Sequence, residues 1–191
     1  AEITIETRYP WEGEAVYTVK PVTGQEFTLA IHVPYYVDLG QEETCLTVNG
    51  ERINAQEILQ KGYVYIRRKW ADGDQVAIRF PMEVRRVYAN QRVREDAGCV
   101  ALMRGPVVYC FEGVDNGELI QSLRIPREAA VTPYVCEEGI LKGNTLLKIE
   151  GCRMVGSEAL YSEKPPVREE AVLTAIPYYA WANRGETQMR V

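Results

Sequence analysis

One histidine and five cysteines are the side chains of this chain that could bind a metal ion or act as nucleophiles. Zinc sites usually contain ligand pairs separated by only a few residues, whereas the nearest cysteines, Cys99 and Cys110, are eleven positions apart. His32 alternates with apolar residues in LAIHVP, which places it on the opposite face of a strand from them rather than in the role of a general base. We therefore predict no metal ligand, no cofactor and no catalytic residue in this chain. We expect reduced, buried thiols at Cys45, Cys99, Cys110, Cys136 and Cys152.

Acidic side chains could supply the carboxylate pair of a glycosidase, in which an acid and a nucleophile lie about 5–10 Å apart. The chain has 27 Asp and Glu residues, so some pair at this distance is expected by chance. Two neighbouring pairs, Glu95–Asp96 and Glu112–Asp115, stand beside turn residues, where carboxylates are ordinarily solvated. These acids therefore do not indicate a catalytic site.

The segment Arg104-Gly105-Pro106 bears on whether Cys99 and Cys110 can pair. A two-residue hairpin loop made of Arg104 and Gly105 would place the two cysteines opposite each other. That loop needs the backbone N–H of residue 106, which proline lacks. We therefore expect this segment to kink a strand or to change sheets, with no disulfide between the cysteines.

A cluster of arginines lies in the segment MEVRRVYANQRVRED, where acidic residues are interspersed with them. Charges of mixed sign favour local salt links or docking to an acidic surface over nucleic-acid binding. The residues for which we predict an interdomain or partner contact are Arg85, Arg86, Tyr88, Asn90, Arg92 and Arg94.

Aromatic side chains are the remaining candidates for ligand binding, with twelve Tyr, three Trp and three Phe. Exposed rings can stack on the apolar face of a sugar, whereas buried rings would serve a sandwich core or an interdomain seam. The second role is favoured, because strand alternation buries about half of such rings. The candidates for sugar stacking are Trp11, Trp70 and Trp181, the last of which lies close to Tyr178 and Tyr179.

The overall composition, 46% hydrophobic and 26% charged, is typical of a globular domain. A net charge of -5 argues against nucleic-acid and anionic-membrane partners. No apolar run approaches the roughly 20 residues that span a bilayer. The first residues, AEITIETRYPWEGE, lack the features of a signal peptide and an initiator Met, so we expect a processed or excised chain. The cysteines, expected to be reduced, favour a reducing compartment, and we predict a cytoplasmic protein.

The hydrophobic pattern has a period of two, as in EFTLAIHVP, and therefore predicts strands. Asn49-Gly50 is a strong signal for a tight hairpin, and Asp72-Gly73 repeats it. Helix is predicted for at most a turn or two in INAQEILQKG, which Gly62 would end as a C-cap, and for a short piece in PREAAV. Glycines recur about every ten residues, a spacing typical of an antiparallel sandwich or barrel, at Gly13, Gly24, Gly40, Gly50, Gly62 and Gly73.

A domain boundary is predicted near Pro81, because proline cannot donate to a sheet ladder and the strand pattern restarts after it. We predict an all-β protein of two small antiparallel β-sandwich modules, jelly-roll-like and with little helix, at 1–82 and 83–191. A single larger sandwich is the alternative.

Five segments resemble a known family in sequence and order: TRYPWEGE, FTLAIHVP, LTVNGE, GYVYIRRKWADGDQVAIRFPMEVRRVYANQRVREDAGCVALMRGPVVYCFEGVDN and AIPYYAWANRGETQMRV. With them the chain resembles the C-terminal part of glycoside hydrolase family 127, the bacterial β-L-arabinofuranosidases. The resemblance extends over nearly the whole chain and is weakest over 119–170.

The resemblance implies that the catalytic part lies elsewhere. In that family an (α/α)₆ barrel carries a cysteine nucleophile, a glutamate and a zinc ion with further cysteines, including an adjacent Cys-Cys pair. This chain contains no such pair, so no catalytic residue is transferred to it. The expected function is that of a non-catalytic region that packs on the absent barrel, stabilises it and contributes to a homodimer. The alternatives are a carbohydrate-binding module and a free-standing enzyme.

Overall fold

Two units of antiparallel β-sheet make up the chain in a computed structural model that describes residues 1–22, 26–41 and 43–191. They are Ala1–Glu83 and Val84–Val191, so the division falls one residue beyond the predicted boundary. Within these described residues, all strand pairings are antiparallel and helix is confined to short turns, which confirms the all-β prediction. The predicted turn residue Gly24 lies outside the described residues.

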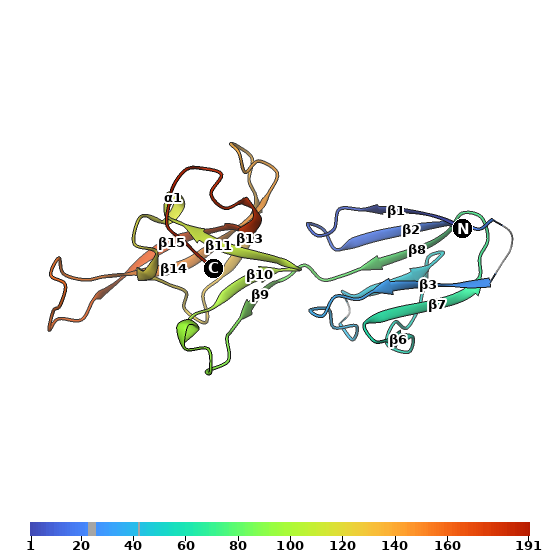
Figure 1. Ribbon diagram of the computed structural model, residues 1–191, viewed down its shortest axis with the longest axis horizontal. Coiled ribbons are helices and arrows are strands. Elements are labelled where there is room, and N and C mark those ends of the chain that lie inside the picture. The colour runs from blue at the N-terminus through green and yellow to red at the C-terminus, as the bar shows by residue number, and fades with distance from the viewer. Residues whose placement is uncertain (23–25, 42) are drawn as a thin grey trace. The chain divides into compact units, whose positions relative to one another are not determined.

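The first unit is a sandwich of a five-stranded sheet, in the order β1-β2-β8-β4-β5, and a three-stranded sheet, β3-β7-β6. Figure 1 shows β1, β2 and β8 in one layer and β3 and β7 in the other. The strands are β1 (Glu2–Thr7), β2 (Glu14–Lys20), β3 (Glu26–His32), β4 (Cys45–Val48), β5 (Glu51–Arg52), β6 (Leu59–Gln60), β7 (Tyr63–Lys69) and β8 (Asp74–Arg79).

The core of the first unit lies between these two sheets. Alternate residues along the strands point to the inner face of each sheet and are buried, as the period of two requires. Among them are Leu29 and Ile31 of β3 and Val76 and Ile78 of β8. Trp70, which follows β7, fills the same core and is only 2% exposed.

The hairpin predicted at Asn49-Gly50 is confirmed. Asn49 has φ of 52° and Gly50 of 82°, and they join β4 to β5. The Asn49 side chain also ties this turn to β8: its Nδ2 donates to Asp74 Oδ1 at 2.8 Å, and its Oδ1 accepts the Gln75 N–H at 2.8 Å. The turn is therefore held by its backbone conformation and by the neighbouring strand.

The hairpin predicted at Asp72-Gly73 is wrong, although the chain does turn there with Gly73 at φ of 83°. The strands on either side, β7 and β8, belong to different sheets. The buried Trp70 between them is the physical reason, since the chain crosses from one layer to the other at this point.

The two predicted helical segments contain no helix. INAQEILQKG forms a turn followed by β6, and Gly62 ends no helix: with Lys61 it makes the two-residue loop between β6 and β7, at φ of 49° and 81°. Positive φ at both loop positions matches the twist of a hairpin. PREAAV forms a turn ahead of β13.

The second unit is one eight-stranded sheet, in which β12-β14-β15-β11-β10-β9 form the main order. In addition β13 pairs with β14, and β16 pairs with β11. The strands are β9 (Val84–Val87), β10 (Ala101–Arg104), β11 (Val107–Glu112), β12 (Leu123–Arg124), β13 (Val131–Val135), β14 (Thr145–Val155), β15 (Val167–Pro177) and β16 (Met189–Arg190), and the helical turns are η1 (Arg94–Asp96), α1 (Gly113–Asn116), η2 (Ile120–Ser122) and η3 (Tyr178–Ala180).

Apolar clusters lie on both faces of this sheet. Tyr109 and Phe111 of β11 join one apolar cluster, whereas Cys110 between them joins a smaller cluster. Adjacent strand residues point to opposite faces. Glu112, two positions after Cys110 on β11, therefore points to the same face as Cys110 and is also buried.

The turn at Arg104-Gly105-Pro106 corrects a prediction. Gly105 and Pro106 form the loop, because Arg104 pairs with Val107 and Met103 with Val108. This loop is displaced by one residue from the one considered above, and it places proline where no N–H is needed. Gly105 supplies the positive φ, 54°. In this register Cys99 is not opposite Cys110, and the described cysteines are all free thiols.

Candidate functional site

Glu112, the last residue of β11, is a carboxylate with no exposed surface. It points to the same face as Cys110, and the loop that follows β15 covers it. The expectation that Glu112 and Asp115 are solvated is therefore wrong for Glu112. A charge in this position costs several kcal/mol unless it is paired and hydrogen-bonded.

Arg184 supplies that pairing. Its Nε and Nη2 donate to Glu112 Oε2 at 3.2 and 2.5 Å, and its Nη1 and Nη2 donate to the Asp115 carboxylate at 2.8 and 2.5 Å. The Ala182 N–H donates to the other Glu112 oxygen at 2.9 Å. These bonds, first those to Asp115 and then those to Glu112, raise the pKa of Arg184. One guanidinium thus binds two carboxylates and offsets one of their two negative charges, and Glu112, which has no exposed surface, is not accessible as an acid or nucleophile.

Cys110 lies beside this cluster and is completely buried. Burial, followed by the negative charge of Glu112, raises the pKa of its thiol to about 12. Since the thiolate is the nucleophilic form, Cys110 is inert at neutral pH.

Asn116 completes the cluster at the end of α1. Its Nδ2 donates to the carbonyls of Glu112 and Thr174, and its Oδ1 accepts the Thr174 N–H. Arg153 donates to the Asn116 carbonyl. The result is a fixed connection between the end of β11 and the middle of the sheet.

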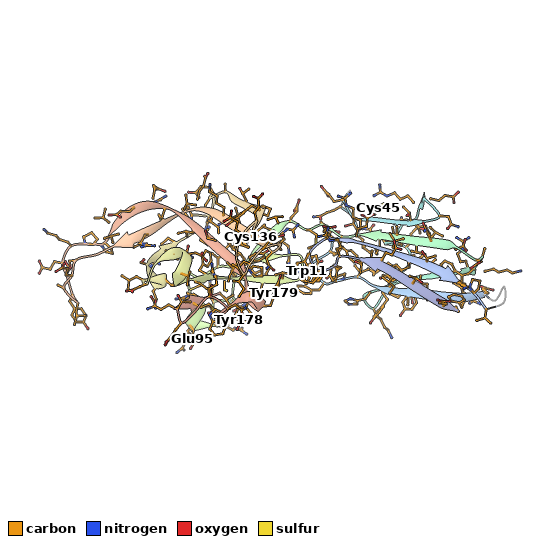
Figure 2. The ribbon with its side chains drawn as sticks, turned by 90° about the horizontal axis from the view of Figure 1, so that it is seen from above. Trp11, Cys45, Glu95, Cys136, Tyr178 and Tyr179 are labelled. Carbon is orange, nitrogen blue, oxygen red and sulfur yellow. The ribbon has the colours of Figure 1, made fainter. Side chains whose placement is uncertain are left out.

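The loop that Glu112 holds carries an exposed aromatic pair. The rings of Tyr178 and Trp181 have planes 9° apart and centroids 6.1 Å apart, and they are 44% and 41% exposed. Tyr178 and Tyr179 lie next to each other where β15 ends (Figure 2). The Tyr179 hydroxyl donates to Asn144 Oδ1 at 2.7 Å. The two rings stack on each other and are partly exposed, and a sugar ring could stack on an exposed ring face.

The other two residues predicted to stack on sugar have different positions. Trp11 is 47% exposed in the turn that follows β1 of the first unit. The prediction for Trp70 is wrong: it is a core residue whose indole N–H donates to the Phe27 carbonyl at 2.9 Å. Alternation along β7 continues past its end and points this ring inward.

The arginine cluster of 85–94 is divided. Arg85 donates to the Gly105 carbonyl, and Arg86 donates to the carbonyls of Pro126 and Ala129, so both contact residues of their own unit. The remaining members are exposed: Tyr88, Asn90, Arg92 and Arg94. Their contact with another domain or subunit stays a prediction.

Across residues 1–22, 26–41 and 43–191, the structure contains no group of three His, Cys, Asp or Glu side chains placed to hold a metal ion. His32 is exposed and packs edge-on against Tyr63, with centroids 5.2 Å apart. Three of the cysteines predicted to be buried are only partly so, namely Cys45, Cys99 and Cys136. In the same described ranges, no helix has the length and apolar character to cross a membrane.

The fold and the cluster define an all-β chain of two units in which one arginine binds the carboxylates of Glu112 and Asp115, whereas Glu95 and Asp96 are exposed. Residues 1–82 match "Beta-L-arabinofuranosidase, GH127 middle domain", and residues 84–191 match "Glycoside hydrolase family 127 C-terminal domain". The chain belongs to glycoside hydrolase family 127.

The named relatives that this chain resembles are β-L-arabinofuranosidases and a β-arabinofuranosidase. A non-reducing end β-L-arabinofuranosidase from Bifidobacterium longum subsp. longum is 35% identical over 201 residues, which cover 99% of this chain and 30% of that protein. A GH127 β-L-arabinofuranosidase from Geobacillus stearothermophilus T6 has a TM-score of 0.91 and 41% identity over 99% of this chain and 29% of that structure. The GH127 β-arabinofuranosidase BT3674 has a TM-score of 0.85 and 31% identity, and 31% of it is covered. The chain therefore spans about a third of the length of these relatives.

Arg184 was not predicted as the partner of Glu112, which lies 72 positions away in the sequence. The only local signal was the sequence Asn183-Arg184-Gly185 directly after an aromatic cluster. It gives no indication of which carboxylate the arginine meets.

Proposed function

We propose that this chain is the non-catalytic β-region of a family 127 glycoside hydrolase and that it packs on an (α/α)₆ catalytic barrel and stabilises it. The observation that carries the proposal is the match of both units to the middle and C-terminal domains of the family, together with the third of each named relative that the chain spans. The nucleophile and the zinc ion would belong to the barrel.

The chemistry of the cluster supports this assignment. Most glycosidases use one protonated and one ionised carboxyl group that reach the substrate. Glu112 and Asp115 share one guanidinium, and Glu112 has no exposed surface. Their role is to hold the loop that follows β15.

Exposed apolar side chains support docking to other protein. On β1 all residues are exposed, including Ile3 and Ile5 at 40% and 53%. In the loop between β14 and β15, Leu160 and Tyr161 are 96% and 93% exposed. Exposed apolar residues that gather into one patch mark interaction surfaces, and the proposal assigns these residues to contacts with the barrel and with a second copy of the chain.

Two experiments test the proposal. The 191-residue chain alone is assayed on an aryl β-L-arabinofuranoside, and no turnover is expected; turnover by the pure chain would refute the non-catalytic role. The parent enzyme is then compared with a truncation that lacks this region. We expect a clearly lower Tm and faster inactivation of the truncated enzyme, and equal thermal stability would refute the stabilising role.

A second candidate function, carbohydrate binding, is favoured by the parallel, exposed rings of Tyr178 and Trp181. Arabino-oligosaccharides are titrated against the intrinsic tryptophan fluorescence of the chain. Trp181→Ala is expected to lower affinity about tenfold, whereas Trp11→Ala, an exposed tryptophan of the other unit, is the matched control. Equal affinities of the two variants would exclude the aromatic pair as the binding site.

A further inference from the structure

The second unit contains a pocket of about 470 Å³ that the proposed function does not use. Its floor is the apolar cluster of the sheet, with Phe111, Ile120 and Leu173 each less than 10% exposed. This volume lies within the range of about 300–1,000 Å³ that is usual for small-molecule sites. The pocket therefore offers a preformed apolar surface for a ligand of moderate size.

The rim of the pocket is positively charged. Arg124 and Arg190 both line it. Arg124 Nη1 donates to the carbonyls of Gln121 and Leu123 at 2.7 and 2.8 Å, which fixes its position at the rim. Arg190 Nη2 lies 3.0 Å from Cys99 Sγ, which also lines the pocket.

The ion pairs found over 1–22, 26–41 and 43–191 include neither arginine. A guanidinium that is fixed by neutral groups keeps its charge and further N–H donors for an incoming acid. An apolar floor below two such cations is complementary to a molecule with an apolar body and one negative group.

We propose that this pocket binds a small organic anion with an apolar body, which Arg124 and Arg190 hold by its charged end. The ligand chemistry differs from that of a neutral sugar, so the site is independent of the proposed function and of the aromatic pair. Cys99 would lie at the edge of the bound molecule and would be shielded by it.

The probe pair that tests this is 8-anilinonaphthalene-1-sulfonate and N-phenyl-1-naphthylamine, which share an apolar body and differ in the sulfonate. The chain is titrated with each under native conditions, and the rate of iodoacetamide labelling at Cys99 is measured by peptide mass spectrometry. We expect the sulfonate to bind at least tenfold more tightly than the neutral amine. We also expect it to slow labelling of Cys99 without slowing that of Cys45, a partly buried thiol of the first unit.

Arg124→Gln and Arg190→Gln test the rim directly. Each is expected to weaken sulfonate binding about tenfold, as the loss of one charge-assisted hydrogen bond implies. Arg127→Gln, which changes an exposed arginine of the same segment that does not line the pocket, is the control. Protection of Cys99 is expressed as a ratio within each variant, because Arg190→Gln also alters the thiol's own surroundings.

The proposal fails if the two probes bind equally well, if the sulfonate binds without protecting Cys99, or if both arginine variants bind it as Arg127→Gln does. Loss of parental arabinofuranosidase activity plays no part in this test, so its outcome is distinguishable from that of the proposed function.

Discussion

The side-chain amide of Asn116 pairs with both backbone groups of Thr174, as a residue of a neighbouring strand would. Its Oδ1 accepts the Thr174 N–H at 2.9 Å, and its Nδ2 donates to the Thr174 carbonyl at 2.8 Å. The neighbouring strand β11 pairs with Ala175 through Phe111 and then leaves the sheet into α1. The amide thus satisfies a backbone position that the departing strand would otherwise leave unpaired.

Asn116→Ala is expected to lower the free energy of unfolding by roughly 2–4 kcal/mol, because two backbone groups of Thr174 lose their partners. Urea denaturation measures this change. Asn116→Asp, which keeps an acceptor for the Thr174 N–H but loses the donor, is expected to be destabilising as well. A change below about 0.5 kcal/mol for the alanine variant would contradict the role given to the amide.

Arg184→Met is expected to destabilise the second unit by about 3–5 kcal/mol, since it leaves the carboxylate of Glu112 buried without its cation. The matched control is Arg168→Gln, which breaks the exposed pair with Glu170 and should change stability by less than about 1 kcal/mol. Both are measured by chemical denaturation. Similar losses in the two variants would argue against the importance of burial.

Stability should fall as pH rises above about 9. The pKa of Cys110 is raised from 9.0 to about 12 and that of Tyr109 from 10.0 to about 12, both mainly by burial. At a pH between the pKa of the unfolded state and that of the folded state, the folded chain holds more protons than the unfolded chain. A rise in pH through this range therefore favours unfolding. The contribution is complete below pH 9 and lost as pH approaches 12.

Cys110→Ala and Tyr109→Phe each remove one of these ionisations. We expect each variant to flatten the decline of unfolding free energy between about pH 9 and 12, measured by urea denaturation at fixed ionic strength. Cys99→Ala, in which a partly exposed thiol is replaced, is the control. An unchanged slope in both test variants would show that other groups cause the alkaline loss.

Asn49→Ala is expected to cost about 2 kcal/mol in the first unit. Alanine at a positive φ of 52° costs about 1 kcal/mol, and the bonds to Asp74 and Gln75 are also lost. Asn49→Gly loses the same side-chain hydrogen bonds as the alanine variant but carries no penalty at positive φ, so it should be the milder change. Thermal denaturation of the two variants separates the contributions, and a glycine variant as unstable as the alanine variant would show that backbone conformation is unimportant here.

The sequence by itself determined the local features of this protein. The period of two in EFTLAIHVP predicted a strand whose Leu29 and Ile31 face the core, because alternate side chains of a strand point to opposite faces. Asn49-Gly50 predicted its hairpin, because these residues tolerate the positive φ that the turn requires. The resemblance of long segments predicted the family.

Tertiary structure decided which distant residues meet. Trp70 continues the alternation of Val64 and Ile66, and the packing of the two sheets makes the face that these residues share the core. Glu112 resembles a solvated turn acid in sequence, but a loop that begins 66 residues later covers it and brings Arg184 to its carboxylate. Strand alternation fixes the side of the sheet on which a residue lies, and only the packing of later segments on that side determines whether it faces water or a partner.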